Sequence, residues 1–129
     1  MPAGEGFSAA QRFEIDRAIR DAETICRYEF SVYVGAADSE SRPFAERLHA
    51  SLVAPERSVL VMVDPAGRLL EIVTGADVRR DLDDSAVKLA AVAMQSAFAI
   101  GDLLGAIKRG LAMLAEAARQ PTTLHDSQP

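Results

Sequence analysis

The sequence has few of the residues that most often mark a chemical site or a cross-linked scaffold. It contains one cysteine, Cys26, two histidines and no tryptophan, and its only aromatic residues are five phenylalanines and two tyrosines. A single cysteine cannot form an internal disulfide, which argues against a small secreted domain and favours a reducing compartment. Cysteine–histidine spacing of the kind that binds zinc is also absent. We therefore expect an aliphatic core.

Clustered positive charge and long apolar runs are missing as well. Nineteen acidic and fourteen basic residues give a net charge of −5, and the pairs Arg79-Arg80 and Lys108-Arg109 are too small for a nucleic-acid surface. No run approaches the roughly 18 apolar residues that cross a bilayer. The start, MPAGEGFSAAQRFE, lacks the apolar centre of a signal peptide. We expect a cytoplasmic protein that neither binds nucleic acid nor inserts into a membrane.

The apolar periodicity predicts one domain over residues 8–118, preceded by a disordered leader at 1–7 and followed by a flexible tail at 119–129. A capping box at Ser8 and Gln11 starts the first predicted helix. The later predicted elements are a strand at 30–34, a helix after Ser39 or Ser41, strands at 58–63 and 68–74 around a turn at 64–67, and helices starting at Asp83 or Asp84 and at Asp102.

This order of elements defines the expected fold class. Two strands joined through a helix form a parallel pair, and the hairpin returns the third strand antiparallel to the second. We predict an α/β fold with a small mixed β-sheet, a parallel pair plus an antiparallel hairpin strand, covered by about four to five helices. A chain of 129 residues is the size of one such domain.

The aspartates around the third strand allow two interpretations. Asp83, Asp84 and Asp102 are candidate ligands for a weakly held Ca²⁺ or Mg²⁺, because these hard cations take several carboxylate oxygens. Each of the three also lies at a predicted helix start, where a carboxylate accepts backbone N–H bonds. No D-x-D-x-D-G loop is present. We favour capping over metal binding.

No complete catalytic set is recognisable, and we assign no catalytic or cofactor-binding residue. Cys26 lies on the apolar stripe of a predicted helix and lacks a phosphate-binding loop. Asp64 ends a strand, but Pro65-Ala66-Gly67 behind it makes it a turn former. His49 and His125 are predicted surface histidines, one on a helix flank and one in the tail. Gly105 and Gly110 are expected to permit helix packing within the domain.

An ordered series of motifs over residues 8–118 resembles the TPM domain family. The series consists of Thr74-Gly75 at a strand end, Asp83-Asp84 before a long helix, then Phe98, Gly101-Asp102, Gly105 and Gly110. The resemblance implies a TPM-like sandwich, and members of that family have been described as acid phosphatases, calcium-binding modules and accessory factors of membrane assemblies. With twelve arginines to two lysines, the chain looks like a soluble actinobacterial-type member.

These observations predict a non-enzymatic module that contacts an unidentified protein partner. The alternative is a divalent-cation-assisted acid phosphatase acting on phosphate monoesters, with Asp83, Asp84 and Asp102 as ligands and Asp64 or Asp81 assisting. A third hypothesis is a structural homo-oligomer held by a helical face.

Overall fold

The computed structural model describes residues 7–119, which form four α-helices, two short 3₁₀ turns and three strands. The first half of this region contains α1 (Ala9–Cys26), β1 (Glu29–Val34), α2 (Ser41–Ala50), the 3₁₀ turn η2 (Pro55–Arg57) and β2 (Ser58–Asp64). The second half contains β3 (Leu69–Thr74), the 3₁₀ turn η3 (Val78–Arg80), α3 (Asp84–Ala99) and α4 (Leu103–Ala117).

The three strands form one mixed sheet in the order β1-β2-β3. β1 and β2 are parallel, with Phe30 opposite Val59, and β3 returns antiparallel to β2, with Ile72 opposite Val61. The predicted fold class is therefore confirmed. The parallel pair brings the carboxyl ends of β1 and β2 to the same edge of the sheet, where the chain enters the loop before α2 and the hairpin turn.

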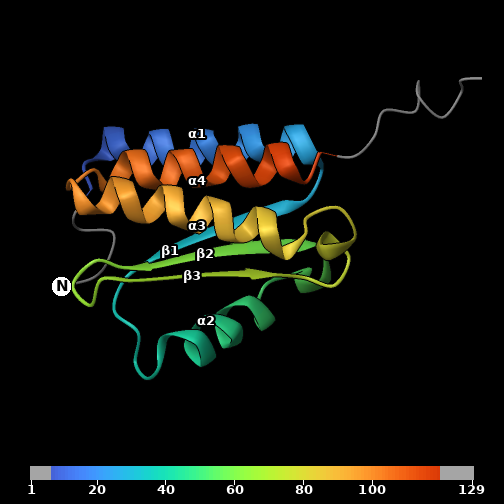
Figure 1. Ribbon diagram of the computed structural model, residues 1–129, viewed down its shortest axis with the longest axis horizontal. Helices are drawn as coiled ribbons and strands as arrows, with labels where there is room; N and C mark the ends of the chain where they lie inside the picture. The colour runs from blue at the N-terminus through green and yellow to red at the C-terminus, as the bar shows by residue number, and fades with distance from the viewer. Residues whose placement is uncertain (1–6, 120–129) are drawn as a thin grey trace, which may run out of the picture.

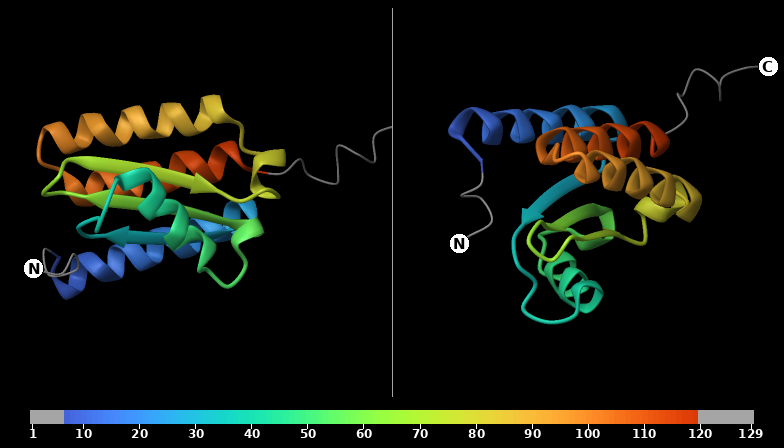
Figure 2. Two further views of the ribbon diagram at one scale, coloured as in Figure 1. Left: turned by 90° about the horizontal axis from the view of Figure 1, so that it is seen from below. Right: turned by 60° about the vertical axis from the view of Figure 1, so that its left-hand side comes forward.

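The helices cover the two faces of the sheet unequally. α1, α4 and α3 lie side by side over one face, with α4 in the middle, and α2 alone lies against the other (Figures 1 and 2). Every residue of β2 is buried, because the central strand is covered from both sides. This explains why its sequence, SVLVMVD, shows no alternation of apolar and polar residues.

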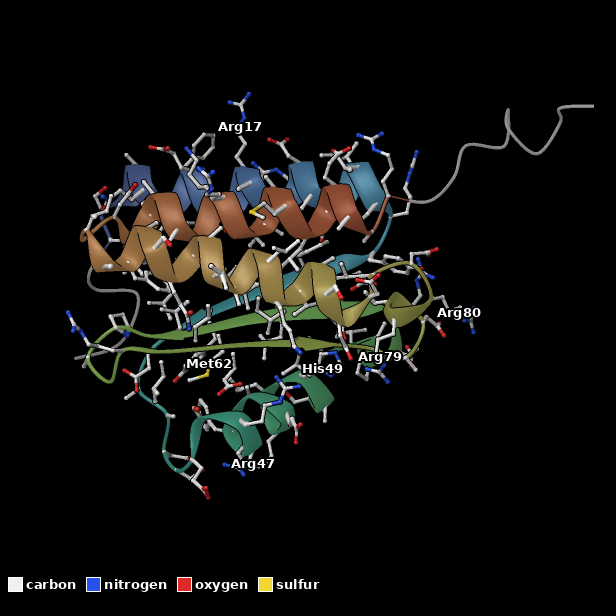
Figure 3. The ribbon with its side chains drawn as sticks, viewed as in Figure 1. Arg17, Arg47, His49, Met62, Arg79 and Arg80 are labelled. Atoms are coloured by element: carbon white, nitrogen blue, oxygen red, sulfur yellow. The ribbon has the colours of Figure 1, made fainter. Side chains whose placement is uncertain are left out.

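Side chains alternating along β2 divide the core into two parts. Val59, Val61 and Val63 face the layer of three helices and join the larger apolar cluster. Leu60 and Met62 face α2 and join the smaller one (Figure 3). At about 25 cal/mol per Å² of apolar area buried, the larger cluster supplies most of the hydrophobic stabilisation.

Phe7 belongs to the larger cluster although it lies at the very start of the described region. Its side chain is only 8% exposed. The capping box follows immediately, since Gln11 N donates to Ser8 Oγ and Ser8 N donates to the Gln11 side chain. Residues 1–6 of the predicted leader and the predicted tail from residue 120 lie outside the described residues. The leader and the flexible tail therefore remain predictions.

Candidate functional site

The three aspartates predicted as metal ligands do not converge. Asp83 caps α3, where its Oδ1 accepts a hydrogen bond from Ala86 N at 2.9 Å. Asp84 is the first residue of the same helix. Asp102 caps α4, where its Oδ1 accepts from Gly105 N at 2.9 Å. Because α3 has 16 residues, roughly 24 Å of helix separates Asp102 from the other two.

The neighbouring acids have protein partners of their own. Asp77 pairs with Arg80 at 3.2 Å, and the Asp81 carboxylate accepts a hydrogen bond from the Tyr28 hydroxyl. Within residues 7–119, no group of three or more His, Cys, Asp or Glu side chains is placed so that it could hold a metal ion. The geometry therefore fits the capping interpretation, while the weakly bound cation at Asp83, Asp84 and Asp102 stays a prediction.

Asp64 is a buried carboxylate at the carboxyl end of β2. It is 7% exposed, and its oxygens accept hydrogen bonds from Gly67 N at 3.0 Å and Ala37 N at 3.4 Å. The first bond closes the hairpin turn, as the sequence predicts, and the second ties the loop after β1 to the same point. Asp64 thus holds two loops together at the edge where open α/β sheets bind their ligands.

A half-open hollow of about 540 Å³ lies beside Asp64. Its walls come from the hairpin, through Arg68 and Leu69, and from the junction of α3 and α4, through Phe98 and Leu103. Sequence reasoning did not find this hollow, because the hairpin and the junction are about thirty residues apart and only the packing of α3 beside β3 brings them together. No local motif signals it.

His49 differs from its prediction as a surface histidine. Its side chain is 9% exposed, and its Nε2 lies 2.9 Å from Ser58 O at the start of β2. Figure 3 places it between α2 and the sheet. The prediction was wrong because His49 takes the last turn of α2, where the helix leans onto the sheet. His125 lies outside the described residues.

Cys26 is fully buried at the end of α1, as its place on the apolar stripe predicts. Burial raises the pKa of its thiol above the ordinary value, and the carboxylates of Glu23 and Asp81 raise it further, against backbone hydrogen bonds that lower it. A raised pKa disfavours the thiolate, which is the nucleophilic form. Cys26 is therefore a core residue in this fold.

Three large apolar side chains are exposed on α3 and at its C-cap. Leu89, Val92 and Ile100 are 65%, 59% and 82% exposed, and with the exposed Ser96 they follow helical spacing along one side. We call these four residues the α3 face. The only charged residue between Asp84 and Asp102 is Lys88. By contrast, the outer side of α1 carries exposed charges, including Arg17, which projects away from the helix (Figure 3).

A second, shallower hollow adjoins the α3 face. It has a volume of about 510 Å³ and lies between α3 and α4, lined by Ala93, Ser96 and Ile100 from one side and by Asp102, Gly105 and Arg109 from the other. No charged residue of α3 lines it. An apolar ridge and an adjoining depression thus lie on the same part of the surface.

The sequence profile of one protein family, a domain of unknown function (DUF5130), matches residues 1–115. The chain belongs to this family. The expected membership of the TPM domain family is wrong, because the matching profile is that of DUF5130. The motifs that suggested TPM are general helix boundaries here: Asp83 and Asp102 are caps, and Thr74-Gly75 ends a strand. Such boundary motifs indicate the order of helices and strands, and they are too general to identify a family.

Relatives of this DUF5130 member occur in mycobacteria. Uncharacterised protein Rv2468c of Mycobacterium tuberculosis H37Rv is 27% identical over 108 residues, which cover 84% of this chain and 65% of that protein. Uncharacterised protein MT2543 of strain CDC 1551 matches to the same extent. The chain thus spans about 65% of the length of the curated relatives that it matches.

Three solved structures have the same fold. The BA42 protein of the psychrophilic bacterium Bizionia argentinensis superposes with a TM-score of 0.78 at 20% identity, over 87% of this chain and 81% of that one. The N-terminal domain of a Porphyromonas gingivalis protein gives a TM-score of 0.73 at 17% identity, over 86% and 75%. The N-terminal domain of cg2496 from Corynebacterium glutamicum gives 0.65 at 18%, over 87% and 71%. At these identities the likeness extends to the fold alone.

No helix within residues 7–119 has the length and apolar character needed to span a membrane.

Proposed function

We propose that this DUF5130 domain is a non-enzymatic cytoplasmic module that binds another protein through the α3 face. The observation that carries the proposal is the exposure of Leu89, Val92 and Ile100 on a helix with one charged residue between its ends. Contiguous apolar surface rimmed by polar residues is typical of protein-binding sites on soluble domains. The cytoplasmic location is part of the proposal and is supported by the sequence, whose single cysteine cannot form an internal disulfide.

The shape of this surface supports a helical partner. Residues of the α3 face recur every three or four positions, so they form a ridge along the helix axis that a second helix can pack beside. The hollow next to Ile100 can accept one apolar side chain of that partner, and Arg109 at its rim can pair with an acidic residue. Because both Arg109 and Asp102 line this hollow, an amphipathic helix with charged residues of both signs beside its apolar stripe fits best.

The proposal is tested by reversing the character of the α3 face. In the double variant Leu89→Glu, Val92→Glu both changes fall at exposed positions, so the domain should fold, which circular dichroism checks. The matched control is Arg12→Ala, Arg17→Ala on the outer side of α1, which lowers the net charge by the same two units. In affinity capture from native cell extract with quantitative mass spectrometry, we expect the wild type and the control to retain the same protein. The α3 variant should retain at least about tenfold less, as the loss of about 1.4 kcal/mol predicts.

Two outcomes would contradict this proposal. Equal retention by the α3 variant and the wild type would remove the α3 face as the binding surface. A wild type that sediments as an oligomer, with a monomeric α3 variant and no other protein captured, would favour the homo-oligomer hypothesis.

The acid phosphatase alternative has one observation in its favour. Asp64 lies at the carboxyl ends of the parallel strands and lines the larger hollow. Hydrolysis of p-nitrophenyl phosphate with added Mg²⁺ separates the two functions. Turnover that is lost both in Asp64→Asn and in Asp83→Asn would favour the phosphatase, and turnover that survives both substitutions would come from a contaminating enzyme. Our proposal expects no turnover above that of the buffer.

A further inference from the structure

β3 is an edge strand with a regular row of outward backbone groups. Gly75 N donates to Ser58 O at 2.9 Å, which fixes the alternation of the β2–β3 ladder. Residues an even number of positions from Gly75, namely Val73 and Glu71, therefore point their N–H and C=O toward β2. Leu70, Ile72 and Thr74 point theirs outward, away from the sheet.

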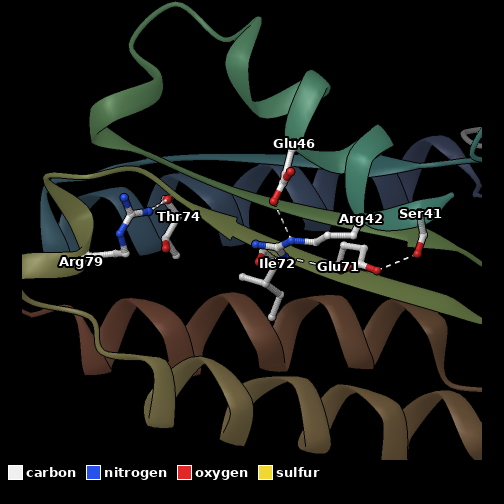
Figure 4. Close-up of polar contacts among 7 residues, drawn as sticks. All are labelled: Ser41, Arg42, Glu46, Glu71, Ile72, Thr74 and Arg79. Atoms are coloured by element: carbon white, nitrogen blue, oxygen red, sulfur yellow. Dashed lines mark hydrogen bonds and ion pairs between the residues drawn. The ribbon is translucent and has the colours of Figure 1, made fainter.

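Two arginines bind part of this outward row. Arg42 from α2 donates through Nη1 to Ile72 O at 2.8 Å, and Arg79 from η3 donates to Thr74 O. Figure 4 shows both guanidinium groups at the β3 edge, between α2 and the layer of helices. The arginines occupy carbonyls only. Within residues 7–119, the N–H groups of Leu70, Ile72 and Thr74 make no hydrogen bond.

A row of outward donors at two-residue spacing is a template for another strand. β3 contains no proline, lysine or bulge of the kind that blocks such pairing. Ile72 itself is only 7% exposed, so an incoming strand has to displace the arginine contacts; the Arg42 side chain is 49% exposed and Arg79 is exposed, which leaves both free to move aside. An incoming strand can therefore take their place at the carbonyls while its own carbonyls accept the three N–H bonds.

The charges near the edge indicate what that strand contains. Arg68 precedes β3 and Arg79 lies beyond its end, and neither makes an ion pair within the described part of the chain. Arg42, between them, is already paired with Glu46 and Glu71. Positive charge thus flanks both ends of a strand of six residues, about 20 Å long, in a protein of net charge −5.

We propose that the outer edge of β3 binds an extended segment of a partner protein as a fourth strand. The segment has β-branched residues at its centre, for pairing with Leu70, Ile72 and Thr74, and an acidic residue at each end, for Arg68 and Arg79. This surface shares no residue with the α3 face, and the inference stands whether or not that face binds a helix.

Amide hydrogen exchange followed by NMR tests the proposal on the wild-type chain. The probe is a capped six-residue peptide of alternating valine and threonine with aspartate at each end. At about ten times its dissociation constant, exchange at Leu70, Ile72 and Thr74 should slow about tenfold. Exchange at Glu71 and Val73, which already bond to β2, should not change. This alternation distinguishes strand addition from binding at the α3 face, which would instead shift the amides of Leu89 and Val92.

Two peptides and two pairs of variants complete the test. The same peptide with lysine ends should bind at least about tenfold more weakly, a difference of about 1.4 kcal/mol. Arg79→Ala should reduce that preference, while Arg17→Ala on α1 should leave it unchanged. Thr74→Pro removes one outward donor and should weaken binding, whereas Thr74→Val keeps the donor and should not.

Several results would overturn the inference. These are the absence of slowed exchange at the three amides at millimolar peptide, slowing that does not alternate along β3, and equal binding of the lysine-ended peptide. A peptide with a central proline that binds as well as the probe would also overturn it. If Thr74→Pro fails to fold, the exchange measurement on the wild type still decides the question.

Discussion

Buried polar side chains join the layers of this domain. His49 contacts Ser58 O, the Ser58 hydroxyl donates to Ala54 O at 2.6 Å, and Asp64 accepts two backbone bonds. Within the described residues, no buried side-chain nitrogen or oxygen lacks a hydrogen-bond partner. Because an unpaired buried polar group costs roughly 1–3 kcal/mol, these contacts fix where α2 and the hairpin lie on the sheet.

The position of Gly75 has no room for a side chain. A Cβ added there would lie 2.1 Å from Pro55 O and 2.5 Å from Glu56 O, and both are backbone atoms of η2. We predict that Gly75→Ala lowers the free energy of unfolding by about 3 kcal/mol, the upper end for overpacking, as measured by urea denaturation. The comparison variant is Gly101→Ala, where nothing lies within 4 Å but φ is +82°. It should cost about 1 kcal/mol. Equal effects of the two substitutions would contradict the steric explanation.

At the scale of the element, charged side chains cap the ends of helices and the edges of the sheet. Asp83 and Asp102 accept N–H bonds at the starts of α3 and α4. Glu23 accepts from Phe30 N at 3.0 Å beside β1, while Arg42 donates to a β3 carbonyl. These charges satisfy backbone groups that the ends of helices and the edges of sheets leave unpaired.

The carboxylate of Asp83 can stabilise α3 through its hydrogen bond and through its negative charge, and substitutions can distinguish the two contributions. We predict that Asp83→Ala lowers the free energy of unfolding by about 1 kcal/mol, whereas Asp83→Asn changes it little, because asparagine also caps helices well. Thermal unfolding at fixed pH measures both. Asp84→Asn serves as the control, since Asp84 makes no side-chain cap bond in the structure. A loss in Asp83→Asn equal to that in Asp83→Ala would show that the negative charge matters more than the hydrogen bond.

At the scale of the whole molecule, the packing of the helical layer sets the distances between the aspartates. α3 places Asp83 and Asp84 at one end of the domain and Asp102 at the other, about 24 Å apart. Asp83 and Asp84 therefore cannot share one bound ion with Asp102 in this structure. The same layer creates the hollow beside Asp64 and turns the α3 face outward.

The distance between the two groups of aspartates predicts how the protein responds to added Ca²⁺ or Mg²⁺. When Ca²⁺ or Mg²⁺ is titrated and amide shifts are followed, any response at Asp83 and Asp84 should have its own midpoint, distinct from that at Asp102, because charges that far apart interact weakly in water. Asp83→Asn should weaken the first response and leave the second unchanged. One shared midpoint with a single bound ion would contradict the structure's separation of the two groups.

Much of the fold was predictable from local signals. Period-two and helical patterns located the strands and helices, the capping box and aspartates located helix starts, and the 64–67 turn paired β2 with β3. Such features depend on neighbours within about four residues, which the sequence displays directly. The assignment to the TPM family was wrong because it relied on the same local features, and helix-boundary motifs occur in many unrelated families.

The sequence by itself determined the strand order, the helix starts at Asp83 or Asp84 and at Asp102, and the burial of Cys26, because periodicity and capping chemistry act along the chain. Only the tertiary structure decided the burial of His49, the hollow beside Asp64 and the arginines at the β3 edge. Each of these joins residues distant in sequence, as Arg42 joins Ile72. Their proximity follows from how the layers pack, and no local pattern records that packing.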